Sequence, residues 1–209
     1  MDKYSSFRHM EQWERGGIDY RLRWRIGSTQ IAIFCIHGGN IEPGTSQVAD
    51  RIAGADHTFY ALEGLKKSGN TTLHITSTVY DEPIALEIIC RSETIISIHG
   101  CSETEEVVYL GGLDLVLKER IREKLDEAGF RTLDNVEAKY RGVDQKNICN
   151  LCGRGMGVQL ELSKGLRVRM FKDLTAEGRQ YPTEIFHRFV QAVRDGLDPF
   201  KKPVKEWPE

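Results

Sequence analysis

The stretch Ile-Ala-Ile-Phe-Cys-Ile-His-Gly-Gly, residues 31–39, decides the fold of this 209-residue chain. Its first six residues form a continuous apolar run, which is typical of a β-strand in an α/β sheet. A second run, Thr-Ile-Ile-Ser-Ile, ends in the same dipeptide, His99-Gly100. Ligands bind at the carboxyl ends of strands in open α/β sheets, so His37 and His99 are expected to converge on one point if their strands are neighbours.

The pattern around these runs predicts a single α/β domain over residues 1–198, with a mixed, mostly parallel sheet flanked by helices. Further strands are predicted at residues 20–26, 58–62, 73–76, 107–110 and 158–162. Helices are predicted from about residue 45 and at residues 83–90, 113–128 and 183–193, the last ended by Gly196 and Pro199. Residues 199–209 contain three prolines and are expected to be a loosely ordered tail.

Composition excludes several classes of partner. The net charge is −2 and the isoelectric point is near 6.3, so no global field attracts nucleic acid or an anionic membrane. The chain has no apolar run long enough for a membrane span, and residues 1–15 are polar, unlike a secretory signal. A soluble monomer made in the cytosol is therefore expected. An odd number of cysteines, five, favours a reducing compartment, and the pair Cys149 and Cys152 lacks the second pair of a structural zinc site.

Glu42 adds a carboxylate to the two strand-end histidines. It follows His37 by five residues, beyond the Gly38-Gly39 pair, so a loop can fold it back toward the same point. Two histidines and one glutamate form a catalytic Zn²⁺ set that leaves the fourth position open to water. A single histidine at a strand end is more often an ordinary core or loop residue, but only His37 and His99 of the six histidines share this setting.

Glu161 lies in the middle of a strand with strict alternation, Val-Gln-Leu-Glu-Leu at residues 158–162. Alternation places it opposite the apolar face, where a carboxylate is either solvated or directed into a site. The pattern alone favours the solvated interpretation.

Three motifs together resemble the poly-γ-glutamate hydrolase family: HGGNIEPGT at residues 37–45, SIHGC at residues 97–101 and GVQLELS at residues 157–163. That family occurs in Bacillus phages and bacterial genomes, and is a small relative of the zinc carboxypeptidases and of the aspartoacylase and succinylglutamate desuccinylase group. The resemblance implies a carboxypeptidase-like fold, zinc bound by His37, Glu42 and His99, and Glu161 as the general base. The larger relatives have an HxxE spacing, whereas four residues separate His37 from Glu42 here.

Hydrolysis of an amide also needs a donor for the tetrahedral oxyanion and cations for substrate carboxylates, and Arg suits both roles. Arg154 is the candidate for the first role, and Arg154, Arg167 and Arg141 are candidates for the second. Each has a solvated surface charge as its alternative.

The expected activity is hydrolysis of γ-glutamyl amide bonds in the anionic polymer poly-γ-glutamate. The alternatives are a zinc deacylase of N-acyl amino acids, a peptidoglycan amidase, and a polymer-binding module with structural zinc. Because the polymer lies outside the cell, the resemblance implies that the protein acts there after release by phage lysis.

Overall fold

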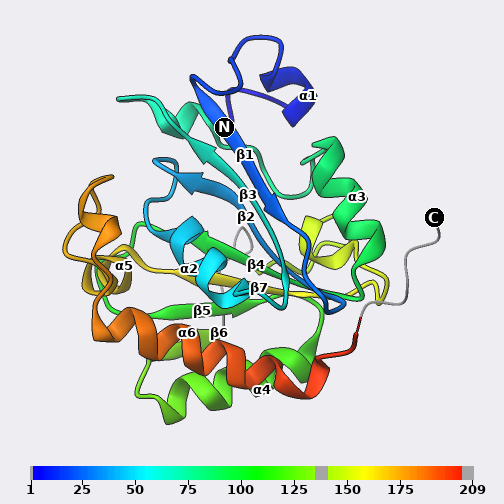
Figure 1. The fold of residues 1–209 in the computed structure, drawn as a ribbon, viewed down its shortest axis with the longest axis vertical. Helices are drawn as coiled ribbons and strands as arrows, with labels where there is room; N and C mark the ends of the chain where they lie inside the picture. The colour runs from blue at the N-terminus through cyan, green and yellow to red at the C-terminus, as the bar shows by residue number, and fades with distance from the viewer. Residues whose placement is uncertain (1, 135–140, 204–209) are drawn as a thin grey trace.

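Seven strands form one mixed sheet in the order β1-β3-β2-β4-β7-β5-β6 in a computed structural model that describes residues 2–134 and 141–203 (Figure 1). The strands are β1 (Tyr20–Arg25), β2 (Ile31–Gly39), β3 (Thr58–Gly64), β4 (Thr94–Gly100), β5 (Val108–Gly111), β6 (Thr132–Asp134) and β7 (Val158–Leu162). The central strands β3, β2, β4 and β7 are parallel, whereas β1 and β5 are antiparallel to β3 and β7. The predicted mixed, mostly parallel sheet is confirmed, and β2 and β4 are neighbours as the two His-Gly motifs required.

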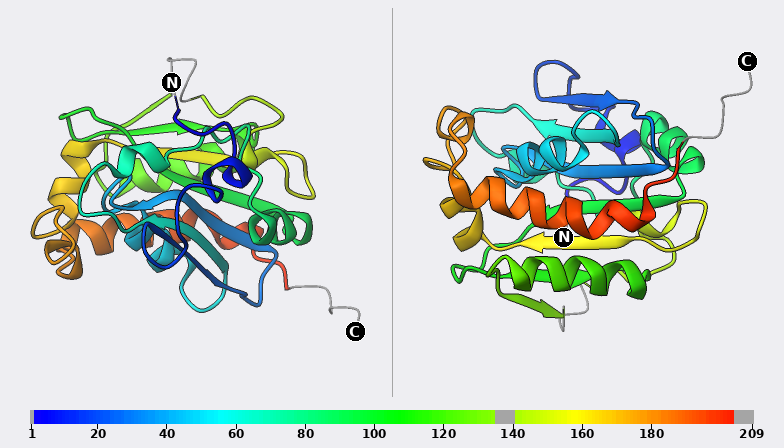
Figure 2. Two further views of the ribbon diagram at one scale, coloured as in Figure 1. Left: turned by 90° about the horizontal axis from the view of Figure 1, so that it is seen from above. Right: turned by 60° about the horizontal axis from the view of Figure 1, so that its bottom comes forward.

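Helices cover both faces of the sheet. They are α1 (Phe7–Met10), α2 (Thr45–Ala53), α3 (Pro83–Arg91), α4 (Leu115–Glu127), α5 (Lys164–Met170) and α6 (Glu184–Leu197). On one face α6 lies between α2 and α4, and the three bury their apolar sides against the sheet (Figure 2, right). The other face is covered by α1, α3 and long loops, which enclose a second apolar core. No helix in the described part of the chain is long and apolar enough to cross a membrane.

Gly196 does not end the last helix, although its residue type predicts a stop. Helix α6 continues through it and ends at Leu197, two residues before Pro199. A Cβ at position 196 would lie 3.0 Å from the Cα of Ile121. The glycine therefore allows α6 and α4 to approach closely.

The strand predicted at residues 73–76 is wrong. The structure has a 3-10 helix, η1 (Asn70–Leu73), followed by a segment that covers the sheet without pairing to it. Leu73 and Ile75 are buried, so their alternation reflects one covered side of a loop. Of the predicted tail, residues 199–203 are described, and the backbone N–H of Gln30 donates to the carbonyl of Lys202 at 2.9 Å. Residues 204–209 lie outside the described part.

Candidate metal centre

The loop after β2 brings Glu42 back to His37. Gly38 and Gly39 allow this turn, since a Cβ at Gly38 would lie 2.8 Å from the Cβ of Ser46 and Gly39 has a φ of +64°. The backbone N–H of Glu42 then donates to the carbonyl of His37 at 2.9 Å. Thr45, the first residue of α2, donates its hydroxyl to the Glu42 carbonyl at 2.7 Å. These contacts explain how a spacing longer than HxxE still places both side chains at one point.

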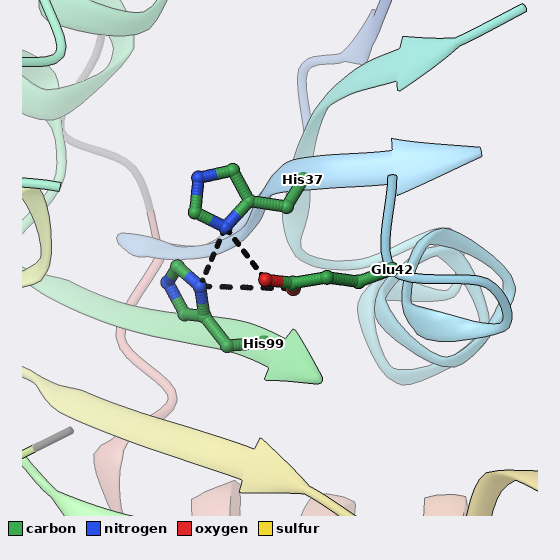
Figure 3. Close-up of side chains that lie close together, drawn as sticks. All are labelled: His37, Glu42 and His99. Atoms are coloured by element: carbon green, nitrogen blue, oxygen red, sulfur yellow. Dashed lines mark hydrogen bonds and ion pairs between the residues drawn. The ribbon is translucent and has the colours of Figure 1, made fainter. Parts of the chain in front are cut away.

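The side chains of His37, Glu42 and His99 converge at the carboxyl ends of β2 and β4 (Figure 3). The Nδ1 atoms of His37 and His99 are 3.1 Å apart, and Glu42 Oε1 lies 3.0 Å from His37 Nδ1. Glu42 Oε2 lies 3.9 Å from His99 Nδ1. Ligand atoms bound to a tetrahedral zinc ion at about 2.0 Å are roughly 3.3 Å from one another, so the donor set fits this metal.

Hydrogen bonds to the other side of each imidazole orient the rings. His37 Nε2 lies 2.9 Å from the carbonyl oxygen of Ile75, which accepts only, so Nε2 carries the proton. His99 Nε2 lies 2.9 Å from the hydroxyl of Ser97. The backbone N–H of Gly100 donates to Glu42 Oε2 at 2.7 Å. Such contacts hold both Nδ1 atoms toward the shared point, as in protein zinc sites.

The electrostatics of the three residues also suit a cation. Burial lowers the pKa of His99 to about 3, and the neighbouring His37 adds to this effect, so the His99 ring is neutral as a metal ligand must be. Burial alone would raise the pKa of Glu42, but His37 outweighs it and brings the pKa to about 2. For His37 burial acts in the opposite direction and would lower the pKa, but the Glu42 carboxylate raises it above its usual value. A cation at the shared point would replace the proton on His37 Nδ1.

Glu161 faces the same point from the next strand. It lies opposite His99 in the β4–β7 register and is only 5% exposed. Gln159 donates an amide N–H to Glu161 Oε1 at 2.9 Å, and Asn147 donates to the Gln159 oxygen at 2.9 Å. Burial, with Glu42 adding to it, raises the pKa of Glu161 well above its usual value. The solvated interpretation of Glu161 is therefore wrong, because the loop that carries Asn147 covers this face of β7.

A cavity of about 590 Å³ joins these residues. His37, Glu42, His99 and Glu161 line it, together with residues from the loops at 74–78 and 141–147. The structure thus assembles a potential metal site and a buried carboxyl around one space that a substrate can enter.

Comparison with known proteins agrees with this arrangement. A family model described as poly-gamma-glutamate hydrolase matches residues 4–192. The UPF0714 protein YndL of Bacillus subtilis (strain 168) is 36% identical over 194 residues, covering 92% of this chain and 76% of YndL. The chain belongs to the poly-γ-glutamate hydrolase family. The SPbeta prophage-derived protein YoqZ of the same strain is 34% identical over 194 residues, which are 92% of this chain and 70% of YoqZ.

Solved structures show that this hydrolase has the family's fold. A bacteriophage poly-γ-glutamate hydrolase superposes with a TM-score of 0.92 at 29% identity, covering 96% of this chain and 98% of the other. Zinc-free YndL gives a TM-score of 0.90 at 34% identity, covering 95% and 98%. A putative carboxypeptidase A from Shewanella denitrificans OS-217 gives a TM-score of 0.52 at 10% identity, covering 87% and 61%. This last similarity shows a carboxypeptidase-like fold and nothing more.

Arg154 of this hydrolase does not reach the cluster of His37, Glu42 and His99. It pairs with the buried Asp114 at 2.7 Å and contacts Thr94, the first residue of β4. His99 lies five residues further along that strand, a distance of about 17 Å. Arg154 precedes β7 and therefore lies at the amino end of the sheet, which corrects the role predicted for it.

Arg167 lies against the site but is not available to a substrate. It is 4% exposed, and its guanidinium donates to the carbonyls of Leu162, Pro43 and Cys101 at 3.1, 2.8 and 2.7 Å. It therefore fastens the loop that carries Glu42 to the ends of β4 and β7. Arg141 alone among the three predicted arginines lines the cavity.

His74 is a cavity residue that the sequence pattern does not reveal. Its ring stacks on His37 with 3.9 Å between centroids, and its Nδ1 lies 2.8 Å from a carboxylate oxygen of Asp2. Asp2 also accepts from the backbone N–H and hydroxyl of Thr76, both at 2.7 Å. No local pattern links residues 2 and 74, so only the tertiary structure shows this contact.

Proposed function

We propose that this hydrolase cleaves γ-glutamyl amide bonds of poly-γ-glutamate with a zinc ion held by His37, Glu42 and His99. The convergence of their three ligand atoms beside a buried Glu161 is the observation that carries the proposal. Bound zinc would polarise the scissile carbonyl and acidify a water molecule. The family membership supports the polymer as substrate.

Glu161 suits the role of general base. Its Oε1 is engaged by Gln159, so Oε2 is the oxygen that takes a proton from the attacking water. A raised pKa lets the same carboxyl hold this proton and then give it to the leaving amine. His74, beside the metal ligands, lines the wall along which the substrate lies.

An elongated binding region supports a polymer over a small N-acyl amino acid. Glu42 and His74 line both the main cavity and a second hollow of about 450 Å³, which Lys3 and Thr72 also line. Arg141 lies in the wall of the main cavity. Asp2 and Asp144 line the same two spaces, so the length of the region, and not its net charge, supports a polymer.

Metal analysis of the purified protein and an assay of viscosity loss of poly-γ-glutamate test this proposal. One zinc per chain and zinc-dependent loss of viscosity are expected. Glu161→Gln should abolish turnover while the zinc content stays the same, and unchanged turnover would exclude Glu161 as the base. Hydrolysis of N-acetyl amino acids without cleavage of the polymer would favour the deacylase. Zinc binding without any hydrolysis would favour the polymer-binding module.

A further inference from the structure

A third hollow, with cationic walls, lies beside α2, the helix that follows the loop carrying Glu42. Its volume is about 630 Å³, and it shares no lining residue with the metal cavity. β1, α2, α6 and the segment between α5 and α6 surround it. The term cationic hollow is used here for this space, which is lined by four arginines, Arg23, Arg25, Arg51 and Arg179, and two phenylalanines, Phe171 and Phe186.

The charges of the cationic hollow are not balanced within it. Asp50 is its single lining carboxylate, and it pairs with both Arg23 and Arg25, at 2.7 and 2.9 Å. Arg23 also pairs with the buried Glu63, at 3.2 Å. Arg51 is exposed on α2 and has no ion-pair partner among residues 2–134 and 141–203. Four guanidinium groups share Asp50 and, through Arg23, Glu63, so positive charge remains in excess here although the net charge of the chain is −2. The local field therefore favours an anionic ligand.

Arg179 is a second, independent indication of an anionic ligand in the cationic hollow. It is only 6% exposed, and its two terminal nitrogens donate to neutral acceptors, the Leu174 carbonyl and the Asn40 side-chain oxygen. Its Nε is buried without an acceptor in the described part of the chain. A buried cation without a carboxylate in contact costs free energy unless a ligand brings the opposite charge.

The cationic hollow is linked to the metal centre through the β2–α2 loop. Arg179 donates to Asn40 at 2.8 Å, and Asn40 precedes the ligand Glu42 by two residues. The same loop leads into α2, which supplies Gln47 and Arg51 to the hollow. One loop, with the helix that follows it, therefore connects the residues of the two spaces.

We propose that the cationic hollow is a second binding site for the carboxylates of a γ-glutamyl chain, separate from the site of cleavage. This inference rests on the proposed function. Each unit of such a chain carries one carboxylate and two methylene groups. Guanidinium groups can pair with the carboxylates.

Binding and kinetics of Arg51→Glu test the second site. Arg51 is exposed, so its reversal should not disturb folding. Arg120→Glu is the control with the same change in charge, because Arg120 lies on α4, outside the cationic hollow, with its side chain 42% exposed. Calorimetric titration of long poly-γ-glutamate into the Glu161→Gln protein avoids turnover. Arg51→Glu in this background should weaken polymer binding by roughly fivefold, and Arg120→Glu should leave it unchanged.

Kinetics of proteins that retain Glu161 distinguish the proposed second site from the proposed hydrolysis. The ratio of kcat/KM for the polymer to kcat/KM for a γ-linked glutamate trimer should fall about fivefold in Arg51→Glu and stay constant in Arg120→Glu. Equal affinities and ratios in all proteins would overturn the second site while leaving the proposed hydrolysis intact. Absence of hydrolysis by the unmodified protein would instead overturn the proposed function, and the titration would still decide whether Arg51 binds the polymer.

Discussion

Ser97 and His99 point to the same face of β4, and the Ser97 hydroxyl lies 2.9 Å from His99 Nε2. The hydroxyl fixes the ring so that Nδ1 faces the proposed zinc position, and such outer contacts tune metal affinity. Ser97→Ala should therefore weaken zinc binding by about 10- to 100-fold, as measured by competition with a chelator. Ser92→Ala is the control, because this buried serine donates to the Ile88 carbonyl at 2.8 Å, away from the metal ligands. Equal zinc affinity in both variants would contradict the role of Ser97.

Gln159→Met should shift the pH profile. Burial and Glu42 raise the pKa of Glu161, whereas the hydrogen bond from Gln159 lowers it. Removing this bond should raise the pKa further, so the acidic limb of kcat/KM should move to higher pH because the base must be unprotonated. The pH profile of polymer cleavage measures this, with the exposed Gln191→Met as control. An unchanged limb would show that Glu161 does not govern it.

Arg167→Met should reduce both stability and zinc affinity. The substitution removes three hydrogen bonds to carbonyls, and at about 1 kcal/mol each the free energy of unfolding should fall by roughly 3 kcal/mol. Zinc affinity should fall as well, because Pro43 is released next to Glu42. Urea unfolding and chelator competition measure the two effects. Arg169→Met on the same helix is 58% exposed in its side chain and should change neither; equal stability of the two variants would refute the proposed role of Arg167.

Arg154→Met should leave polymer cleavage intact and lower stability. Its partner Asp114 is 1% exposed and would lose its counter-charge, at a cost of about 1–3 kcal/mol. A loss of kcat/KM without a loss of stability would restore the catalytic role that the sequence suggested. Urea unfolding and viscosity assays at saturating zinc distinguish these results.

Sequence reasoning located the strand ends because two features coincide there. The apolar runs before His37 and His99 predict buried strands, and strand direction places both histidines at one edge. The prediction that Arg154 binds substrate was wrong, although strand direction could have excluded it. A residue that precedes β7 lies at the amino end of the sheet, and the site lies at the other end.

Glu161 and residues 73–76 show that alternation of apolar and polar residues does not by itself determine the environment of a segment. Alternation in β7 separates two faces but does not reveal that the loop with Asn147 covers the polar one. Leu73 and Ile75 alternate in burial as strand residues do, yet the segment has no partner strand. In both cases the missing information is a contact between segments far apart in the chain.

The position of Asp2 matters for anyone who produces the protein. Asp2 lines the hollow next to Glu42 and accepts hydrogen bonds from Thr76. A tag joined directly before Asp2 would therefore begin beside Glu42 and His74, where it can obstruct the proposed substrate and, if it carries histidines, compete for zinc. Residues 199–203 lie instead at the opposite end of β2, where the backbone N–H of Gln30 donates to the Lys202 carbonyl, so a tag joined after Pro203 would begin away from this hollow.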